Sequence, residues 1–123
     1  VVLTIEKLDR LTPPIIEFLS DVLGGYDAYF IEEIDRGISE LWRVNSGESY
    51  SITRLEFDHC KNKTVLVVCV YKGKNIEQFC DYVLKIVDVQ KWSIRFHTEK
   101  IAFAKWMGSR YNFGKPEIVL KRE

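Results

Sequence analysis

An unbroken run of apolar residues lies near the middle of the chain, from Val65 to Val70. Because polar and apolar residues do not alternate there, we expect a strand that is covered on both faces, as at the centre of a mixed or parallel sheet. Residues 71–75, with the sequence YKGKN, are predicted to form a loop that opens a helix. Cations and free backbone N–H groups at a helix N-terminus favour anions, above all phosphate. The pattern therefore predicts a phosphate-binding turn at this point.

The helix predicted after this loop has the clearest helical period in the chain. Its apolar residues recur at the i, i+3, i+4, i+7, i+8 and i+11 positions, which places them on one face. They are Ile76, Phe79, Cys80, Val83, Leu84 and Val87. Asn75 is expected to cap this helix. Two earlier helices are also indicated: Thr12 opens the first, which ends near Gly24, and Asp27 opens the second, which ends near Gly37.

Strand patterns fill most of the remaining chain. They cover residues 1–7, 41–44, 50–55, 92–96 and 117–121. A polar turn joins the second and third of these into a hairpin, and a fourth, short helix is expected from Thr98 to Gly108. The predicted order is β-αα-βββ-α-β-α-β, an α/β (α+β) fold with a central mixed sheet flanked by helices. At 123 residues we expect a single domain, residues 1–123, without a linker or repeat.

Charge and cysteine usage narrow the function classes. The chain has 18 Lys and Arg against 18 Asp and Glu, so it lacks the basic surplus of a nucleic-acid binder. No apolar run approaches the roughly 20 residues that span a bilayer, and no signal peptide is expected, because charges appear early in the first residues. Three cysteines without a C-x-x-C pair favour a reducing cytoplasm. Cys60 beside His59 is too little for a metal site, so no metal is expected.

The order of these elements and the motifs on them resemble the GNAT family of N-acetyltransferases, closest to the small GNAT-like proteins of bacteriophages. Four stretches carry the resemblance. They are the helix-to-strand join of residues 30–44 with its L-W-x-V strand, the hairpin and strand up to Tyr71, the loop of residues 72–77, and the last helix and strand, residues 102–108 and 118–123. The resemblance implies a sheet that splays between the strands of residues 64–70 and 92–96, and acetyl-CoA as the cofactor.

The resemblance also assigns the cofactor site. Pantetheine would bond to the backbone near Val68 and Val70. The diphosphate would lie on a loop that in working members reads Q/R-x-x-G-x-G/A, where glycines let backbone N–H groups approach closely. In this chain the loop contains Lys72, Gly73, Lys74 and Asn75, with Lys72 in place of the leading cation and Asn75 in place of the first glycine.

Two positions depart from the family pattern. Glu77 stands where the second Gly or Ala is expected, and its carboxylate would repel a bound diphosphate. Ala104 stands where many members place a Tyr as general acid, so Tyr111 could serve only if its loop folds back. Glu56, at the end of the strand before the central one, is the candidate general base; the alternative is a solvated carboxylate at a strand end.

Two functions compete on these grounds. Because of Glu77 and Ala104, the preferred hypothesis is a phage-type GNAT-fold protein that has lost catalysis and acts as a structural or protein-binding component. It would bind a phage or host protein, in the host cytoplasm or the virion, and acetyl-CoA would be a doubtful ligand. The alternative is an active acetyl-CoA-dependent N-acetyltransferase that modifies a primary amine. The oligomeric state is left open.

Overall fold

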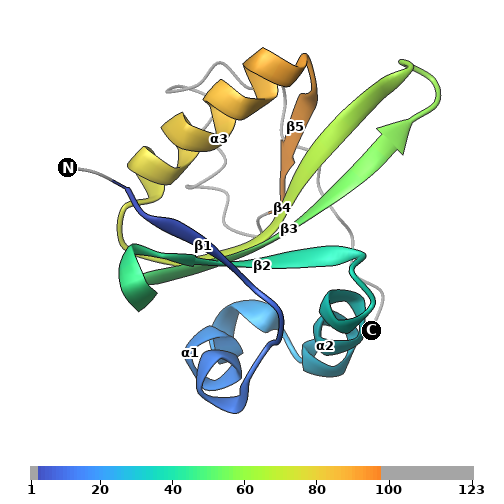
Figure 1. The fold of residues 1–123 in the computed structure, drawn as a ribbon. Coiled ribbons are helices and arrows are strands. Elements are labelled where there is room, and N and C mark those ends of the chain that lie inside the picture. Colours follow the sequence, from blue (N-terminus) through green and yellow to red (C-terminus); the bar gives the residue numbers. More distant parts are fainter. Residues whose placement is uncertain (1–2, 98–123) are drawn as a thin grey trace.

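The computed structural model describes residues 3–97, which form a five-stranded sheet with helices on both faces (Figure 1). The strands lie in the order β1-β2-β3-β4-β5; β1 to β4 are antiparallel, and β5 is parallel to β4. The strands are β1 (Ile5–Leu8), β2 (Ser39–Val44), β3 (Ser49–Asp58), β4 (Lys63–Gly73) and β5 (Ser93–Phe96). The helices are α1 (Pro13–Leu23), α2 (Asp27–Asp35), the short η1 (Asn45–Gly47) and α3 (Ile76–Gln90).

The sheet separates two hydrophobic cores. α1 and α2 cover one face and α3 covers the other (Figure 1). The first core joins the apolar stripe of α1 to Leu41, Ile52 and Val70 of the sheet. The second core joins Phe79, Val83 and Val87 of α3 to the sheet residues Val44, Leu66 and Val68. β4 is therefore covered on both faces, as its unbroken apolar run predicted.

The order of elements is confirmed over the described residues, but several boundaries need correction. β2 begins at Ser39 and β3 continues to Asp58, so both strands are longer than expected. β1 begins at Ile5, later than expected. α2 is preceded by Tyr26 as its N-cap, and Asp27 lies within its first turn. β4 continues through Gly73, because Lys72 and Gly73 pair with Tyr50 and Ser49 of β3. The predicted loop of residues 71–75 therefore shrinks to two residues. The expected helix from Thr98 and the strand of residues 117–121 lie outside the described residues.

A β-bulge interrupts the pairing of β3 and β4 at Cys69. Ile52 lies opposite Val70 and Thr53 lies opposite Val68, so Cys69 is an extra residue in β4. Before the bulge, Leu66 and Val68 face α3. After it the alternation is reversed: Val70 contacts the core under α1, and Tyr71 packs against Phe79 of α3, with ring centroids 4.7 Å apart. The bulge therefore decides which face each following residue occupies.

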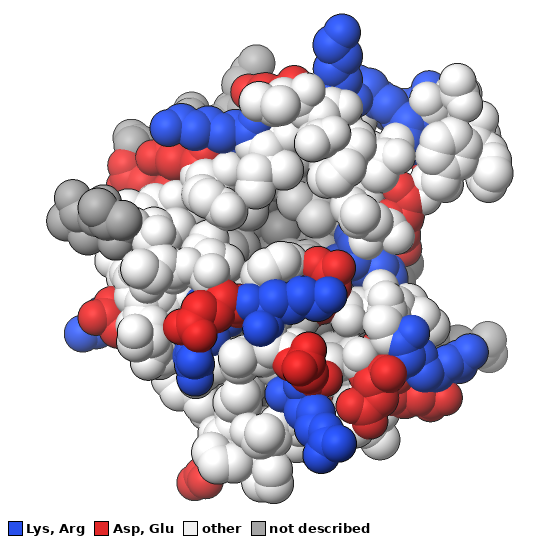
Figure 2. Space-filling model, viewed as in Figure 1, with Lys and Arg blue, Asp and Glu red and all other residues white. Residues whose placement is uncertain are grey.

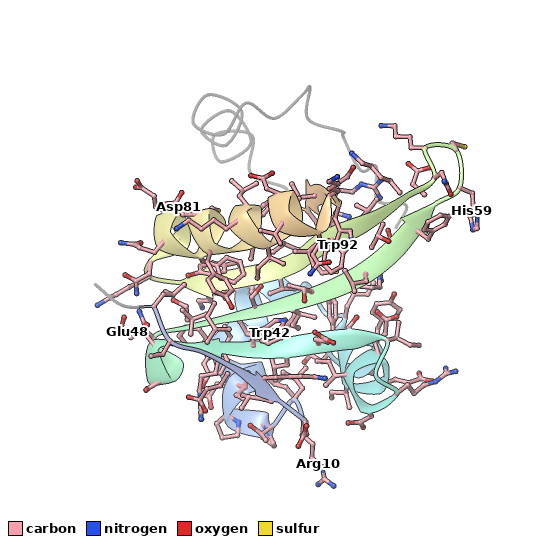
Figure 3. All side chains as sticks on the ribbon, turned by 45° about the horizontal axis from the view of Figure 1, so that its top comes forward. Arg10, Trp42, Glu48, His59, Asp81 and Trp92 are labelled. Atoms are coloured by element: carbon pink, nitrogen blue, oxygen red, sulfur yellow. The ribbon has the colours of Figure 1, made fainter. Side chains whose placement is uncertain are left out.

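The β3–β4 hairpin extends past the helices at one end of the sheet, and at the other end β4 turns into α3. His59 lies near the tip of the hairpin, and Glu48 lies at the end where α3 begins (Figure 3). Gly73, the last residue of β4, has φ +125. A Cβ on Gly73 would lie 2.4 Å from the Glu48 carbonyl oxygen and 2.4 Å from Ser49 Oγ. Only glycine fits at this point.

We expect Gly73→Ala to lower the free energy of unfolding by more than about 2 kcal/mol, because the new methyl group meets backbone as well as an unfavourable φ. Gly25→Ala is the matched control. Gly25 also has a positive φ, +83, but its Cβ would meet nothing within 4 Å, so about 1 kcal/mol is expected. Denaturant unfolding of both variants measures the difference. Equal losses would mean that the Glu48–Ser49 backbone does not constrain Gly73.

Candidate functional site

The pairing of the parallel strands β4 and β5 ends beside the bulge. Val68 and Phe96 are the last paired residues, and the His97 N–H donates to the Val68 carbonyl with an N···O distance of 3.0 Å. β4 continues to Gly73, beyond the end of β5. The Val70 carbonyl accepts the Ser51 hydroxyl at 2.9 Å. Val68 and Val70, the expected pantetheine contacts, thus lie on either side of Cys69, just where the β4–β5 pairing of the described residues ends, and each carbonyl keeps a second lone pair.

Side chains from β3 and β4 hold the turn between β4 and α3. The hydroxyl groups of Ser49 and Tyr71 both donate to the Lys74 carbonyl. Asn75 is the N-cap of α3 in the left-handed conformation, with φ 66 and ψ 31, so it takes the backbone shape expected of the missing glycine. Its side-chain amide donates to Glu48 Oε2 at 2.9 Å and makes no capping bond to α3. The Asn75 side chain therefore does not cap α3, although the sequence predicted that it would.

The two lysines expected to bind diphosphate do not lie together. The Lys72 ammonium donates to the Phe18 carbonyl at 2.7 Å and to Asp21 Oδ1 at 2.6 Å, and it lies 5.0 Å from the centroid of the Phe18 ring. It therefore joins β4 to α1, because the bulge turns residue 72 towards that face. Lys74 is exposed in the turn itself. Among residues 3–97, no hydrogen bond or ion pair engages its ammonium.

Glu56, the candidate base, belongs to a charged network on the α2 face of the sheet. Its carboxylate contacts Arg54 at 2.8 Å and Arg95 of β5 at 3.5 Å. Arg54 also contacts Glu33 of α2 at 3.2 Å and the Tyr29 hydroxyl at 3.2 Å. The sequence patterns did not predict Arg54, Arg95 or Glu33 as site residues. The alternation of Arg54 and Glu56 on one strand face was the available signal, but their partners come from distant elements.

The thiol at the bulge, that of Cys69, has a raised pKa. Burial raises the pKa of Cys69 to about 11, with the Arg54 charge opposing this shift and the Glu33 and Glu56 charges adding to it. Burial likewise raises the pKa of Cys80 to about 12. Both thiols stay protonated at neutral pH.

Other kinds of site find little support in residues 3–97. No group of three or more His, Cys, Asp or Glu side chains within this range could hold a metal ion. In the same range no helix is long and apolar enough to span a membrane. Lys and Arg side chains alternate with Asp and Glu on the face shown in Figure 2, and neither sign forms a broad patch there. Tyr111, the other candidate catalytic residue, lies outside the described residues.

Comparison with known proteins identifies the fold. No family model and no curated protein matches the chain. Among solved structures it is similar to a probable acetyltransferase, with a TM-score of 0.67 and 9% identity over 100% of this chain and 97% of that one. It is also similar to the ribosomal-protein-alanine N-acetyltransferase from Brucella melitensis biovar Abortus 2308, with a TM-score of 0.64 and 11% identity over 99% of each chain.

A third similar structure is an aminoglycoside acetyltransferase from an uncultured soil metagenomic sample, in complex with trehalose. The TM-score is 0.68 and the identity is 7%, over 98% of this chain and 95% of that one. At these identities the likeness shows the fold, which is that of the GNAT acetyltransferases, as the resemblance implied. It does not extend to a bacteriophage origin, which stays a prediction.

We expect iodoacetamide at pH 8 to label Cys60 readily, because Cys60 is exposed, and to label Cys69 and Cys80 at least about 100-fold more slowly. With a pKa of about 11, Cys69 is a thiolate in only about one molecule in a thousand at this pH. Peptide mass spectrometry over time measures the three rates, and labelling in denaturant is the control. Rapid labelling of Cys69 in the folded protein would mean that the bulge holds a reactive thiolate.

Proposed function

We propose that this protein is an acetyl-CoA-dependent N-acetyltransferase that acts on a primary amine. The observation that carries the proposal is the end of β4–β5 pairing at Val68 and Phe96, next to the bulge at Cys69 and in line with the turn into α3. The similar solved structures are named acetyltransferases, which favours this function over the expected loss of catalysis. A protein partner and a cytoplasmic location stay predictions of the sequence.

The backbone of the turn fits a diphosphate, although its sequence departs from the family motif. Asn75 adopts the conformation of the glycine it replaces, and its amide is directed to Glu48. The N–H groups of Ile76 and Glu77 begin the helix without a side-chain cap from Asn75. Lys74 adds one exposed cation at the same turn. Two carboxylates would weaken the binding of an anion here: Glu77 in the first helical turn, and Glu48, which accepts the Asn75 amide.

Two groups of residues would hold acetyl-CoA. Lys74 and the first amides of α3 would hold the diphosphate, and the backbone near Val68 and Val70 would hold the pantetheine. When bound, acetyl-CoA would supply an acetyl thioester: its transfer to an amine replaces the C–S bond with a C–N bond, and coenzyme A leaves as a thiolate that takes up a proton from water, which balances the proton lost by the amine. The amine loses a proton, which we assign to Glu56 because its carboxylate is 37% exposed and contacts Arg95 of β5, the strand whose pairing with β4 ends next to the bulge.

The Cys69 thiol, at the bulge, is not suited to carry the acetyl group. Acyl transfer through an enzyme thioester requires a thiolate nucleophile, and Cys69 keeps its proton at neutral pH. We therefore propose direct transfer from the cofactor to the amine. Ternary-complex kinetics, with intersecting lines in double-reciprocal plots, would follow from this order, whereas an acetylated enzyme would give ping-pong kinetics.

Titration with acetyl-CoA tests the proposal directly. We expect saturable binding by calorimetry, and stabilisation by about 2.7 kcal/mol when the ligand is at a hundredfold excess over its dissociation constant. Thermal unfolding would then show a midpoint raised by several degrees. Coenzyme A without the acetyl group is the reference ligand. Absence of binding at millimolar acetyl-CoA would overturn the proposed function. It would favour the other hypothesis, a GNAT-fold protein that does not bind the cofactor.

We expect Lys74→Ala to weaken coenzyme A binding by about fivefold, because one exposed cation at a helix N-terminus is removed. Lys72→Ala is the matched control and should leave the affinity within about twofold, since the Lys72 ammonium lies against α1. It should instead lower the free energy of unfolding by about 1 kcal/mol. Calorimetry and denaturant unfolding separate the two effects. A larger loss of affinity in Lys72→Ala would place the diphosphate on the α1 face.

A second pair of variants tests how much the Glu77 carboxylate weakens coenzyme A binding. Glu77→Gln should raise coenzyme A affinity by about threefold to tenfold, because a like charge is removed from the first turn of α3. Asp81→Asn removes the same charge one turn further along the helix and should change the affinity by less than twofold. Equal effects in both variants would indicate a general charge effect and not a local one.

A further inference from the structure

The two faces of the sheet differ in access at the β4–β5 boundary. On the α3 face Leu66 and Val68 are 9% and 1% exposed, and they pack with Phe79 and other apolar residues of that helix. On the opposite face the side chains of Glu56 and Arg95 are 37% and 44% exposed. A polar acceptor therefore reaches the end of the strand pairing from the face that carries Glu56 and Arg95.

Within the charged network on this face, the two arginines differ in the number of groups that they contact. Arg54 contacts Glu33, Glu56 and the Tyr29 hydroxyl, and the Arg54 and Glu33 side chains are only 20% and 12% exposed. Arg95 has a single ion-pair contact within residues 3–97, with Glu56 at 3.5 Å, which is longer than a hydrogen bond. Exposed pairs of this kind contribute little to stability, so a ligand can replace the contact at little cost.

The register places Arg95 next to the bulge. Arg54 and Arg95 lie on either side of Val67, because both strands pair with this residue of β4. Cys69 is two positions further along the same strand, about 7 Å away. The backbone of Arg95 thus lies one strand away from β4, near the place where the described β4–β5 pairing ends.

We infer that the acceptor amine carries a carboxylate close to its nitrogen, as a free amino acid does, and that Arg95 binds this carboxylate while Glu56 binds the amine. The inference rests on the proposed function. A guanidinium binds a carboxylate through two parallel N–H···O bonds, which orients the ligand as well as attracting it. The network of two acids and two arginines is neutral as a whole, so a zwitterion replaces the Glu56–Arg95 contact without adding net charge. A plain amine would instead leave Arg95 without an anion when Glu56 turns to the ligand.

Ligands that carry one or both charges test the inference without the cofactor. The zwitterions are glycine, β-alanine and γ-aminobutyrate, and the single-charge probes are propylamine and propionate. We expect at least one zwitterion to bind about tenfold more tightly than either single-charge probe, as measured by NMR titration of the arginine side-chain N–H signals. Acetylation rates, followed through the release of coenzyme A thiol, should show the same preference. Equal binding of propylamine and all three zwitterions would overturn the inference.

Variants at Arg95 assign the preference to this residue. Arg95→Gln should remove the tenfold preference, and Arg95→Lys should retain part of it, because the charge remains without the paired N–H groups. Arg36→Gln is the matched control, since Arg36 forms an exposed pair with Glu32 at the same 3.5 Å distance on α2. Unfolding midpoints confirm that each variant is folded. A preference that survives Arg95→Gln would contradict the inference.

Failure of the inference is distinguishable from failure of the proposed function. Acetyl-CoA binding is measured separately, and it does not depend on which acceptor is used. Binding of acetyl-CoA together with equal acetylation of propylamine and the zwitterions would keep the enzyme and reject the zwitterion. A zwitterion preference that depends on Arg95 in a protein that binds no acetyl-CoA would reject the enzyme and support an amino-acid site.

Discussion

The β-bulge at Cys69 is the constraint on which the rest of the site depends. One extra residue in β4 reverses the alternation of side chains after Val68. As a result Tyr71 packs against α3, and Lys72 reaches α1 on the other face. The bulge also coincides with the last β4–β5 pair, so the interruption of the ladder and the separation of the strands occur at one place.

The turn into α3 illustrates how a chain can keep a backbone shape after its motif has changed. Glycine at this turn would supply a left-handed conformation and room for an anion. Here Asn75 adopts the conformation, and hydroxyl groups from β3 and β4 hold the preceding Lys74 carbonyl. The Asn75 amide is bonded to Glu48 and makes no cap on α3. The left-handed backbone conformation is thus present without a glycine, while Glu77 still adds a negative charge to the first turn of α3.

The charged network behind Glu56 combines a shielded pair with an exposed one. Removing charges from water is costly unless each finds partners, and Glu33 meets this condition through Arg54 and the Ser39 hydroxyl. That inner pair fixes Arg54 and thereby the position of Glu56. The outer contact between Glu56 and Arg95 is longer and more exposed, so it can open while the inner pair keeps its geometry. If Glu56 is the base as proposed, an exchangeable cation beside it would suit the selection of an acceptor.

The sequence by itself determined the features that depend on neighbouring residues. The proline-led start of α1, the period of α3 and the apolar run of β4 predicted these elements, because caps and periodicity act within a few residues along the chain. It also indicated the turn before α3 and the candidate base Glu56.

Only the tertiary structure decided where the side chains around this turn are directed. An apolar run has no alternation that would reveal a bulge, so Lys72 could not be assigned to the α1 face from the sequence. Arg95 and Glu33 join Glu56 from elements far apart in the chain, and pairing register alone brings them together. Local propensity acts over one turn or one strand, whereas a site is assembled by packing and register across the whole sheet.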